Sequence, residues 1–359
     1  RRLLENGANT SFVNRIADKS LAIDDLIENP TQTILSSAKR ENIVGQKHLS
    51  IPLPAELYGQ LRANSKGLDL ANDSALAQLN QTAQQFAKHQ WSAAPMGEHI
   101  QTNDAVAPQS IINPARHTDV VGYVQEATTE QVEQALNNAQ AVQDIWARTA
   151  KDTRASYLLR AADLMEARLE ELMVLLCRES GKTYANAIAE VREAVDFLRY
   201  YATQMIDLDA NAEVEPLGTM LCISPWNFPL AIFTGQVAAA LVAGNTVIAK
   251  PAEQTPLIAA QAIQILWQAG VPQAAVQLMP GRGETVGAQL SAAEQVQGIM
   301  FTGSTEVAKI LQKTVAKRLS KNGESIPLIA ETGGQNAMIV DSSALTEQVV
   351  LDVVSSAYD

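Results

Sequence analysis

Hydrophobic residues recur at every third or fourth position through the middle of the chain, between Thr128 and Met205. This spacing predicts three amphipathic helices, because residues three and four apart lie on one face of an α-helix. Thr128 with Gln131 is a capping-box signal for the start of the first helix. The apolar positions that define the three faces are Val132, Ala135, Ala139, Val142 and Trp146, then Leu158, Ala162, Met165, Leu169, Leu172 and Leu176, and finally Val191, Val195, Leu198, Ala202 and Met205.

After Pro216 the pattern changes to short apolar runs that alternate with helical segments. This alternation predicts an α/β fold with a Rossmann-like, doubly wound parallel sheet. Glu331 follows one further strand-like run of apolar residues. We predict strands at Thr219 to Ile223, Thr246 to Ala249, Val276 to Met279, Gly298 to Phe301 and Ala337 to Val340, and helices at Pro229 to Val242, Pro256 to Ala269, Thr285 to Ser291 and Ser304 to Leu319.

The stretch ahead of these elements carries weaker signals. Ile112-Asn113-Pro114 and Asp119 to Val124 predict a β-hairpin at the edge of the fold. From Pro30 to about Ala107 the chain is rich in Asn, Gln, Ser and Ala, with one helical pattern at Ser74 to His89. We interpret this region as an interdomain linker arm that wraps on a partner surface rather than building a core.

Composition narrows the class of protein. At 359 residues with 47% hydrophobic content the chain has material for about two soluble domains, and no apolar run approaches the roughly 18 to 20 residues of a membrane span. A spread net charge of −12 argues against a nucleic-acid partner. Two distant cysteines, Cys177 and Cys222, indicate neither a disulfide framework nor a zinc site and favour a reduced, cytoplasmic setting.

Four polar motifs follow the apolar runs, where the ends of parallel strands would gather side chains at one edge of a sheet. They are Ser224-Pro225-Trp226-Asn227-Phe228-Pro229, Lys250-Pro251-Ala252-Glu253, Thr302-Gly303-Ser304-Thr305 and Glu331-Thr332-Gly333-Gly334. Each alone would be weak. Together and in this order, over roughly the last three quarters of the chain, they resemble the aldehyde dehydrogenase superfamily.

Asn227 and Glu331 are the predicted catalytic residues. A Pro-bracketed turn that presents one Asn amide suits an oxyanion, and the resemblance implies that Asn227 holds the oxyanion formed when a thiolate attacks an aldehyde. Glu331 is expected to deprotonate the water that hydrolyses the thioester, provided that burial raises its pKa. The alternatives are an Asn that caps the following helix and a salt-bridged Glu at a strand end.

The other motif residues are expected to bind NAD. The resemblance implies that Lys250 contacts the adenosine ribose and that Glu253 accepts its hydroxyl groups, which favours NAD over NADP. Gly303 and Ser304 open a helix whose N–H groups can face the pyrophosphate, although Ala308 replaces the second glycine of the usual family pattern. The alternatives are a solvated Lys–Glu pair and a plain N-cap Ser. The remaining predicted cofactor contacts are Ser224, Pro225, Trp226 and Gly333.

Neither cysteine has the sequence context of the family's nucleophile. Cys177 lies on an apolar helix face and Cys222 within a strand, so both are interpreted as structural. The family places its nucleophile some thirty residues beyond the Glu-Thr-Gly-Gly element, and the chain stops at Asp359. His48, His89, His99 and His117 show no metal-ligand spacing, and no metal is expected.

The first fifteen residues, from Arg1 to Arg15, resemble the last barrel helix of a bacterial proline dehydrogenase domain. Arg1 and Arg2 match adjacent arginines that hold the substrate carboxylate there, or form a basic helix start. The chain begins with Arg rather than Met, and we interpret both ends as cuts through a longer, bifunctional polypeptide whose barrel binds FAD. The expected boundaries are 1–30 for the barrel remnant, 31–107 for the linker arm, 108–330 for the NAD-binding domain and 331–359 for the start of a catalytic domain.

The resemblance implies oxidation of L-glutamate γ-semialdehyde, formed from pyrroline-5-carboxylate, to glutamate with NAD. The segment alone is expected to be inactive, to work with the rest of its parent chain, and to belong to a homo-oligomer. Two alternatives stay open. One is a catalytically silent dinucleotide-binding scaffold, and the other is a dehydrogenase for a different aldehyde such as succinate semialdehyde.

Overall fold

The computed structural model describes residue 16 and residues 20–27, 29–46, 51–101, 106–209 and 214–358. Contacts divide the chain into two units, Arg1–Gln60 and Leu61–Asp359. The first unit contains helices α3 (Ile23–Ile27) and α4 (Pro30–Arg40) and the 3-10 turn η1 (Pro54–Glu56). Asn29 caps α4, and neither α4 nor η1 buries a residue. The residues that line the cavity described below all lie in the second unit.

The second unit is organised around a five-stranded sheet in which every neighbouring pair is parallel. The strand order is β6-β5-β4-β7-β8, so the chain begins in the middle, winds outward to β6, and returns to the other side of β4. This confirms the predicted α/β parallel sheet. The strands are β4 (Thr219–Ile223), β5 (Thr246–Lys250), β6 (Val276–Leu278), β7 (Val296–Gly303) and β8 (Leu328–Thr332).

One strand prediction was wrong. Residues 337–340 form no strand, and Ile339 within them is 93% exposed. An apolar run needs a neighbouring strand for its backbone hydrogen bonds, and the edge of the sheet is occupied instead by β8, which pairs with β7. Glu331 accordingly lies within β8 rather than after a strand.

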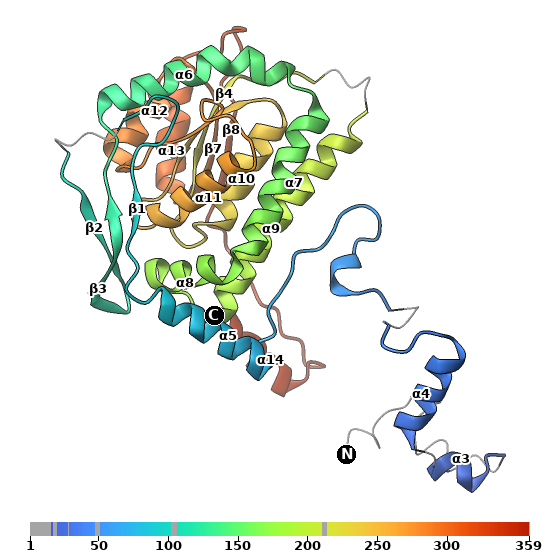
Figure 1. Ribbon diagram of the computed structural model, residues 1–359. Coiled ribbons are helices and arrows are strands. Elements are labelled where there is room, and N and C mark those ends of the chain that lie inside the picture. Colours follow the sequence, from blue (N-terminus) through green and yellow to red (C-terminus); the bar gives the residue numbers. More distant parts are fainter. Residues whose placement is uncertain are drawn as a thin grey trace. The chain divides into compact units, whose positions relative to one another are not determined.

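Helices cover both faces of the sheet, as Figure 1 shows. One face carries α6 (Thr129–Arg148), α12 (Ala288–Ala292), which continues the π-helical turn η2 (Gly283–Gly287), and α13 (Thr305–Val315). The other carries α10 (Ala231–Val242) and α11 (Pro256–Gln268). The capping box of Thr128 and Gln131 at the start of α6 is confirmed.

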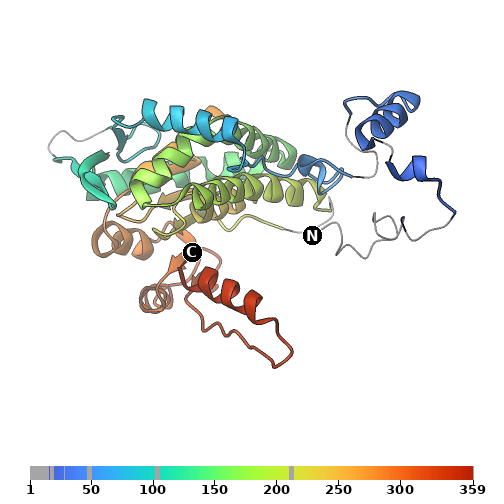
Figure 2. The same ribbon diagram turned by 90° about the horizontal axis from the view of Figure 1, so that it is seen from below.

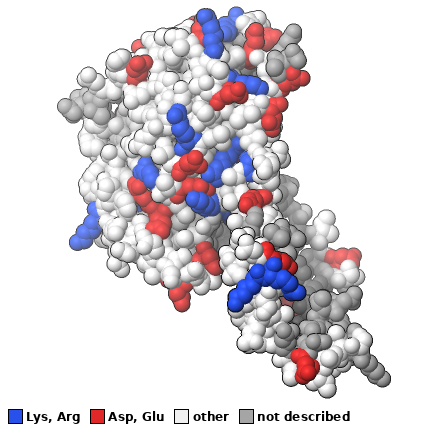
Figure 3. Space-filling view, turned by 45° about the vertical axis from the view of Figure 1, so that its right-hand side comes forward, with Lys and Arg blue, Asp and Glu red and all other residues white. Residues whose placement is uncertain are grey.

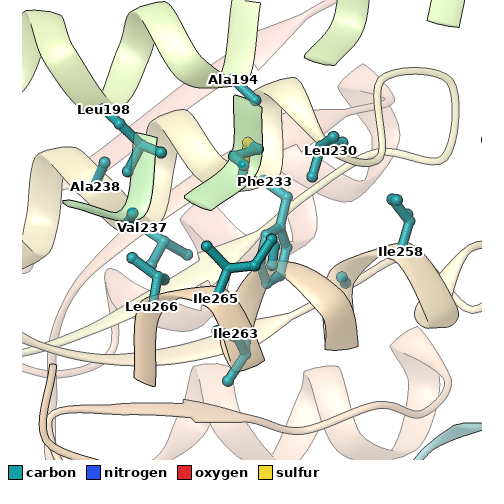
Figure 4. Packing of buried hydrophobic residues seen from close by; sticks show 14 of the residues in the cluster. Ala194, Leu198, Leu230, Phe233, Val237, Ala238, Ile258, Ile263, Ile265 and Leu266 are labelled. Atoms are coloured by element: carbon teal, nitrogen blue, oxygen red, sulfur yellow. The ribbon is translucent and has the colours of Figure 1, made fainter. Parts of the chain in front are cut away.

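Behind α10 and α11 lies a further layer of helices, in which α7 and α9 lie side by side (Figures 1 and 2). This layer, which we call the helical scaffold, consists of α5 (Asp73–Gln85), α7 (Lys151–Ala167), α8 (Leu169–Ser180) and α9 (Tyr184–Asp207). Figure 4 shows side chains of α9, α10 and α11 packing together, with Phe233 between Leu230 and Ile265. Phe233 is 1% exposed, and burial of such apolar side chains holds the layers together.

Strand residues alternate between the two faces because successive side chains of a strand point in opposite directions. Met220 and Cys222 of β4 join the apolar cluster on the scaffold side, whereas Leu221 between them joins the cluster beneath α6. Ile248 of β5 packs on that same α6 side. The sheet therefore has two separate cores and is buried on both faces, as the continuous apolar runs of the sequence indicate.

A smaller sheet lies at the edge of the second unit and has the order β1-β3-β2. Its strands are β1 (Trp91–Ala93), β2 (Gln109–Asn113) and β3 (Arg116–Val124), and the antiparallel pairing of β2 with β3 confirms the predicted hairpin. Leu79, Trp91 and Ala93 join the scaffold-side core. The domain boundaries proposed from sequence stay predictions.

On the face in Figure 3, Lys and Arg side chains are interspersed with Asp and Glu over the described residues. Among the described helices none combines the length and apolar character that a membrane crossing needs. Helix α14 (Thr346–Tyr358) buries no residue and projects from the layered core (Figure 2).

Candidate active site at the carboxyl edge of the sheet

A cavity of about 990 Å³ opens at the carboxyl ends of β4, β7 and β8. Strands β4 and β7 are the neighbours between which the direction of winding reverses. Crossover connections leave a crevice at such a point, and ligands of open α/β sheets bind there. The predicted residues that line this cavity are Asn227, Glu331, Ser224, Pro225, Trp226, Gly303, Ser304 and Gly333.

Asn227 lies in the turn between β4 and α10, and its side chain is exposed toward the cavity. Lys250 O accepts a hydrogen bond of 3.2 Å from Ser224 N at the start of this turn. Asn227 does not cap the helix, because α10 begins at Ala231 and its N-cap residue is Leu230. Among the described residues no partner hydrogen-bonds the Asn227 amide, which leaves both amide hydrogens available to a ligand.

Glu331 reaches the same cavity from β8, where it is paired in register with Thr302 of β7. Its side chain is exposed, so the burial on which the general-base prediction depended is not observed. Glu331 also forms no ion pair within the described part of the chain, so the strand-end salt bridge is not observed either. Gly333 lines the cavity, and neither Gly333 nor Gly334 has a neighbouring atom within 4 Å of the position that a Cβ would take. A carboxylate and an amide donor, distant in sequence, thus meet in one hollow.

Gly303 is the last residue of β7, and Ser304 is the N-cap residue of α13. The Ser304 hydroxyl accepts a hydrogen bond of 3.3 Å from Val307 N, so the N-cap interpretation of this serine is correct. The same residue also lines the cavity. The free N–H groups of the first turn of α13 therefore lie beside the hollow, where the helix dipole favours a phosphate.

Lys250 and Glu253 lie at the end of the adjacent strand, β5, and do not line the cavity itself, although Ala252 between them does. The Lys250 side chain is 4% exposed and Nζ donates to Pro251 O at 3.1 Å. Burial lowers the pKa of Lys250, and the Glu253 carboxylate opposes that shift. Glu253 is exposed whereas Lys250 is buried, and no ion pair joins them among the described residues, so the solvated Lys–Glu pair is not observed.

The two thiols lie apart from the cavity. Cys177 is on α8 and Cys222 is within β4, and neither lines the hollow. Burial raises the pKa of Cys177 to about 11, with Lys182 opposing, and burial also raises the pKa of Cys222. A thiol in such surroundings stays protonated near neutral pH and is a poor nucleophile.

Part of the cavity wall was not predicted from the sequence. Phe197 and Tyr201 of α9 line it with ring centroids 6.0 Å apart, and Gln236 of α10 lies opposite β7 with Nε2 3.1 Å from Thr302 Oγ1. Gln236 is 7% exposed. A polar residue inside an otherwise apolar helix was a signal that could have identified it. Phe197 and Tyr201 had only an i, i+4 spacing, which any buried helix face shows.

Some predicted residues cannot be placed. Arg1, Arg2 and His48 lie outside the described residues. Over the described ranges, no group of three or more His, Cys, Asp or Glu side chains is arranged to hold a metal ion.

The chain is similar to several known proteins in sequence and in fold. The family model described as "Aldehyde dehydrogenase family" matches residues 100–359. The bifunctional protein PutA of Escherichia coli (strain K12) is 60% identical over 359 residues, which is 100% of this chain and 27% of that protein. The chain thus spans only about a quarter of the length of this relative.

Two solved structures are also similar. Proline utilization A (PutA) from Bdellovibrio bacteriovorus matches with a TM-score of 0.83 and 30% identity, covering 99% of this chain and 37% of its own. A 1-pyrroline-5-carboxylate dehydrogenase from Thermus, solved with bound NAD, matches with a TM-score of 0.78 and 31% identity, covering 87% of this chain and 61% of its own.

Proposed function

The chain belongs to the aldehyde dehydrogenase family, and from this premise we propose that it supplies the NAD site and part of the catalytic site of an L-glutamate γ-semialdehyde dehydrogenase. The product would be glutamate, in the second step of proline catabolism. Similarity to PutA and to a 1-pyrroline-5-carboxylate dehydrogenase supports this substrate. The observation that carries the proposal is the shared cavity of Asn227 and Glu331 at the point where the winding of the sheet reverses.

Asn227 is proposed to stabilise the oxyanion that forms when a thiolate adds to the aldehyde carbon. Its amide is exposed in the cavity and has no partner within the described residues, which leaves the donor ready for the developing charge. The thiolate is proposed to come from a cysteine of the longer protein that is neither Cys177 nor Cys222, the two cysteines of this sequence. Cys177 and Cys222 lie away from the cavity, and burial raises the pKa of both.

Glu331 is proposed as the general base of the second half-reaction. Its carboxylate accepts a proton from the water that attacks the acyl-enzyme thioester, and glutamate leaves as the thiol is released. Its position on β8, across the register from Thr302 and on the wall shared with Asn227, supports this role.

The carboxyl edge of the sheet fits NAD. When bound, NAD supplies the acceptor for the hydride of the aldehyde. The first turn of α13 at Gly303 and Ser304 would face the pyrophosphate, and Lys250 with Glu253 would contact the adenosine ribose. An exposed Glu253 carboxylate supports NAD over NADP, because it would repel a 2′-phosphate. Ser224, Pro225, Trp226 and Gly333 would complete the wall around the cofactor.

The longer protein is proposed to oxidise proline with FAD as well. The relative from Escherichia coli is described as bifunctional, and the resemblance of Arg1 and Arg2 to proline-binding arginines agrees with that. This activity, the homo-oligomeric state and the cytoplasmic location stay predictions for the whole polypeptide.

The test is an NADH assay of the full-length protein with glutamate semialdehyde, beside the Glu331→Gln variant. We expect NAD reduction by the wild type, and in the variant a burst of NADH followed by slow turnover, because the thioester accumulates when its hydrolysis is impaired. NAD binding without NADH formation would instead favour a silent scaffold. Faster turnover of succinate semialdehyde than of glutamate semialdehyde would favour a different substrate.

A further inference from the structure

The N-terminus of α10 is held by a carboxylate from a different helix. Glu190 of α9 is fully buried, and its Oε1 accepts hydrogen bonds from Leu230 N at 2.8 Å and Ala231 N at 3.2 Å. These N–H groups belong to the N-cap residue and to the first residue of α10, and the N-cap residue itself provides no side-chain cap. Glu190 therefore caps the N-terminus of α10, although it lies in a distant part of the sequence.

Lys182, in the loop between α8 and α9, completes this arrangement. Its Nζ lies 2.8 Å from Glu190 Oε2 and 4.6 Å from the centroid of the Phe228 ring. The Lys182 side chain is 13% exposed and that of Glu190 is fully buried, so the ion pair is largely screened from water, whereas Phe228 is 41% exposed. One ammonium group thus neutralises the buried carboxylate and holds the aromatic ring that follows Asn227.

These contacts fix one end of the turn that carries Asn227. At the other end, Ser224 N donates to Lys250 O at 3.2 Å. Between the two ends the Asn227 side chain has no hydrogen-bond partner in the described structure, so its direction depends on how its backbone is held. An oxyanion donor must be placed before the charge develops, and small displacements are costly.

We propose that Lys182 and Glu190 are positioning residues for Asn227, acting through Phe228 and through the first turn of α10. The inference rests on the proposed function only for the identity of the reaction. Neither residue lines the cavity, and neither is expected to touch the aldehyde or the cofactor.

The activity test is a double-mutant cycle in the full-length protein. Lys182→Met should lower kcat with glutamate semialdehyde by about 10- to 100-fold, with the Kd for NAD unchanged. In an Asn227→Ala background the same change should cause little further loss, because the donor that it positions is already gone. Lys182→Arg should recover most of the activity, since a guanidinium keeps the ion pair and the ring contact.

A matched control is Arg168→Met, which removes an ion pair of similar length, 2.7 Å to Glu171, elsewhere in the helical scaffold. It should leave kcat unchanged. Losses that add fully in the Lys182→Met, Asn227→Ala double variant would overturn the proposal, because the two residues would then act independently.

A second measurement does not depend on activity. Hydrogen exchange at the amides of Leu230 and Ala231 should speed up in Lys182→Met and more so in Glu190→Ala, and stay slow in Arg168→Met. Unchanged exchange in both variants would sink the inference even with an active wild type. An inactive wild type with the expected exchange pattern would count against the proposed reaction and leave the positioning contacts supported.

Discussion

Polar side chains at the rim of the cavity differ from those in the helical scaffold in how they are partnered. Asn227 and Glu331 are exposed in the hollow, and among the described residues neither side chain has a hydrogen-bond partner or ion pair. In the scaffold, Arg178 is 7% exposed and donates to Asp119 Oδ1 at 2.7 Å and to His89 O at 2.6 Å. Unpartnered groups are available to a ligand, whereas fully partnered groups hold elements together.

The same contrast applies to two glutamates of the scaffold. Glu179 and Glu190 are both buried, and both accept hydrogen bonds from the first N–H groups of helices on the sheet, α11 and α10. Their carboxylates are committed to structure, although by type they would have been candidate acids or bases. Residue type therefore suggests chemistry only where the surroundings leave the group free.

The largest effect is expected from removing the Arg178 guanidinium, which donates hydrogen bonds to Asp119 and to His89 O. Arg178→Met should lower the free energy of opening β3 and α8 by about 3–5 kcal/mol, because it leaves the Asp119 carboxylate, whose side chain is 9% exposed, without its main partner. Hydrogen exchange of the full-length protein measures this. Arg116→Met is the matched control, since Arg116 approaches the same Asp119 at 3.4 Å but is 68% exposed, and should cost less than about 1 kcal/mol.

At the cavity the effect should appear in catalysis instead of stability. Asn227→Ala in the full-length protein should lower kcat by about 10²- to 10³-fold, because one oxyanion donor is lost. Its thermal midpoint should stay close to that of the wild type, since no described residue depends on this side chain. Asn322→Ala, in the exposed loop before β8, should change neither quantity. A large fall in the thermal midpoint of Asn227→Ala would mean that this side chain holds the fold together, as the partnered side chains of the scaffold do.

The buried Glu179 should make the stability of the protein depend on pH. Burial raises its pKa from 4.5 to about 8, and the N–H groups of Leu257 and Ile258 oppose that shift. The native state then holds a proton that the unfolded state releases, so this contribution to stability is fully present below about pH 4.5 and is lost as the pH rises toward 8.

Relative to Glu179→Gln, the wild type should lose on the order of 1.4 kcal/mol of stability per pH unit across that window. Thermal unfolding of both proteins at several pH values would measure the difference. Glu133→Gln, on the exposed side of α6, should show no such trend. A wild-type curve parallel to that of Glu179→Gln would mean that the carboxylate is charged in the folded protein.

The smallest effect is expected at Glu253. Glu253→Gln should weaken NAD binding by about three- to tenfold, because an exposed acceptor for the ribose hydroxyls loses its charge. Binding of NADP should improve at the same time, since the repulsion of a 2′-phosphate is removed. Calorimetric titration with both nucleotides would show the change. Equal weakening for NAD and NADP would remove Glu253 from the adenosine end of the site.

The sequence by itself determined most of the local elements and the class of fold, although the helix predicted through Leu158 to Leu176 is divided at Arg168 into α7 and α8. The apolar runs from Thr219 and Thr246, the helix signals between them and the Thr128–Gln131 capping box all depend on neighbouring residues, and all are confirmed. The four motifs resemble the family through their residues and their order along the chain. Each of them lies at or just after the end of a strand.

Only the tertiary structure decided which strand ends meet. The order of the sheet places β4 beside β7, which brings Asn227 and Glu331 to one cavity, and it gives the edge position to β8 rather than to residues 337–340. The Glu190 cap of α10 and the Lys182 contact with Phe228 likewise join segments that are separate in sequence. Strand order and helix packing follow from burial summed over the whole core, and no local pattern contains that sum.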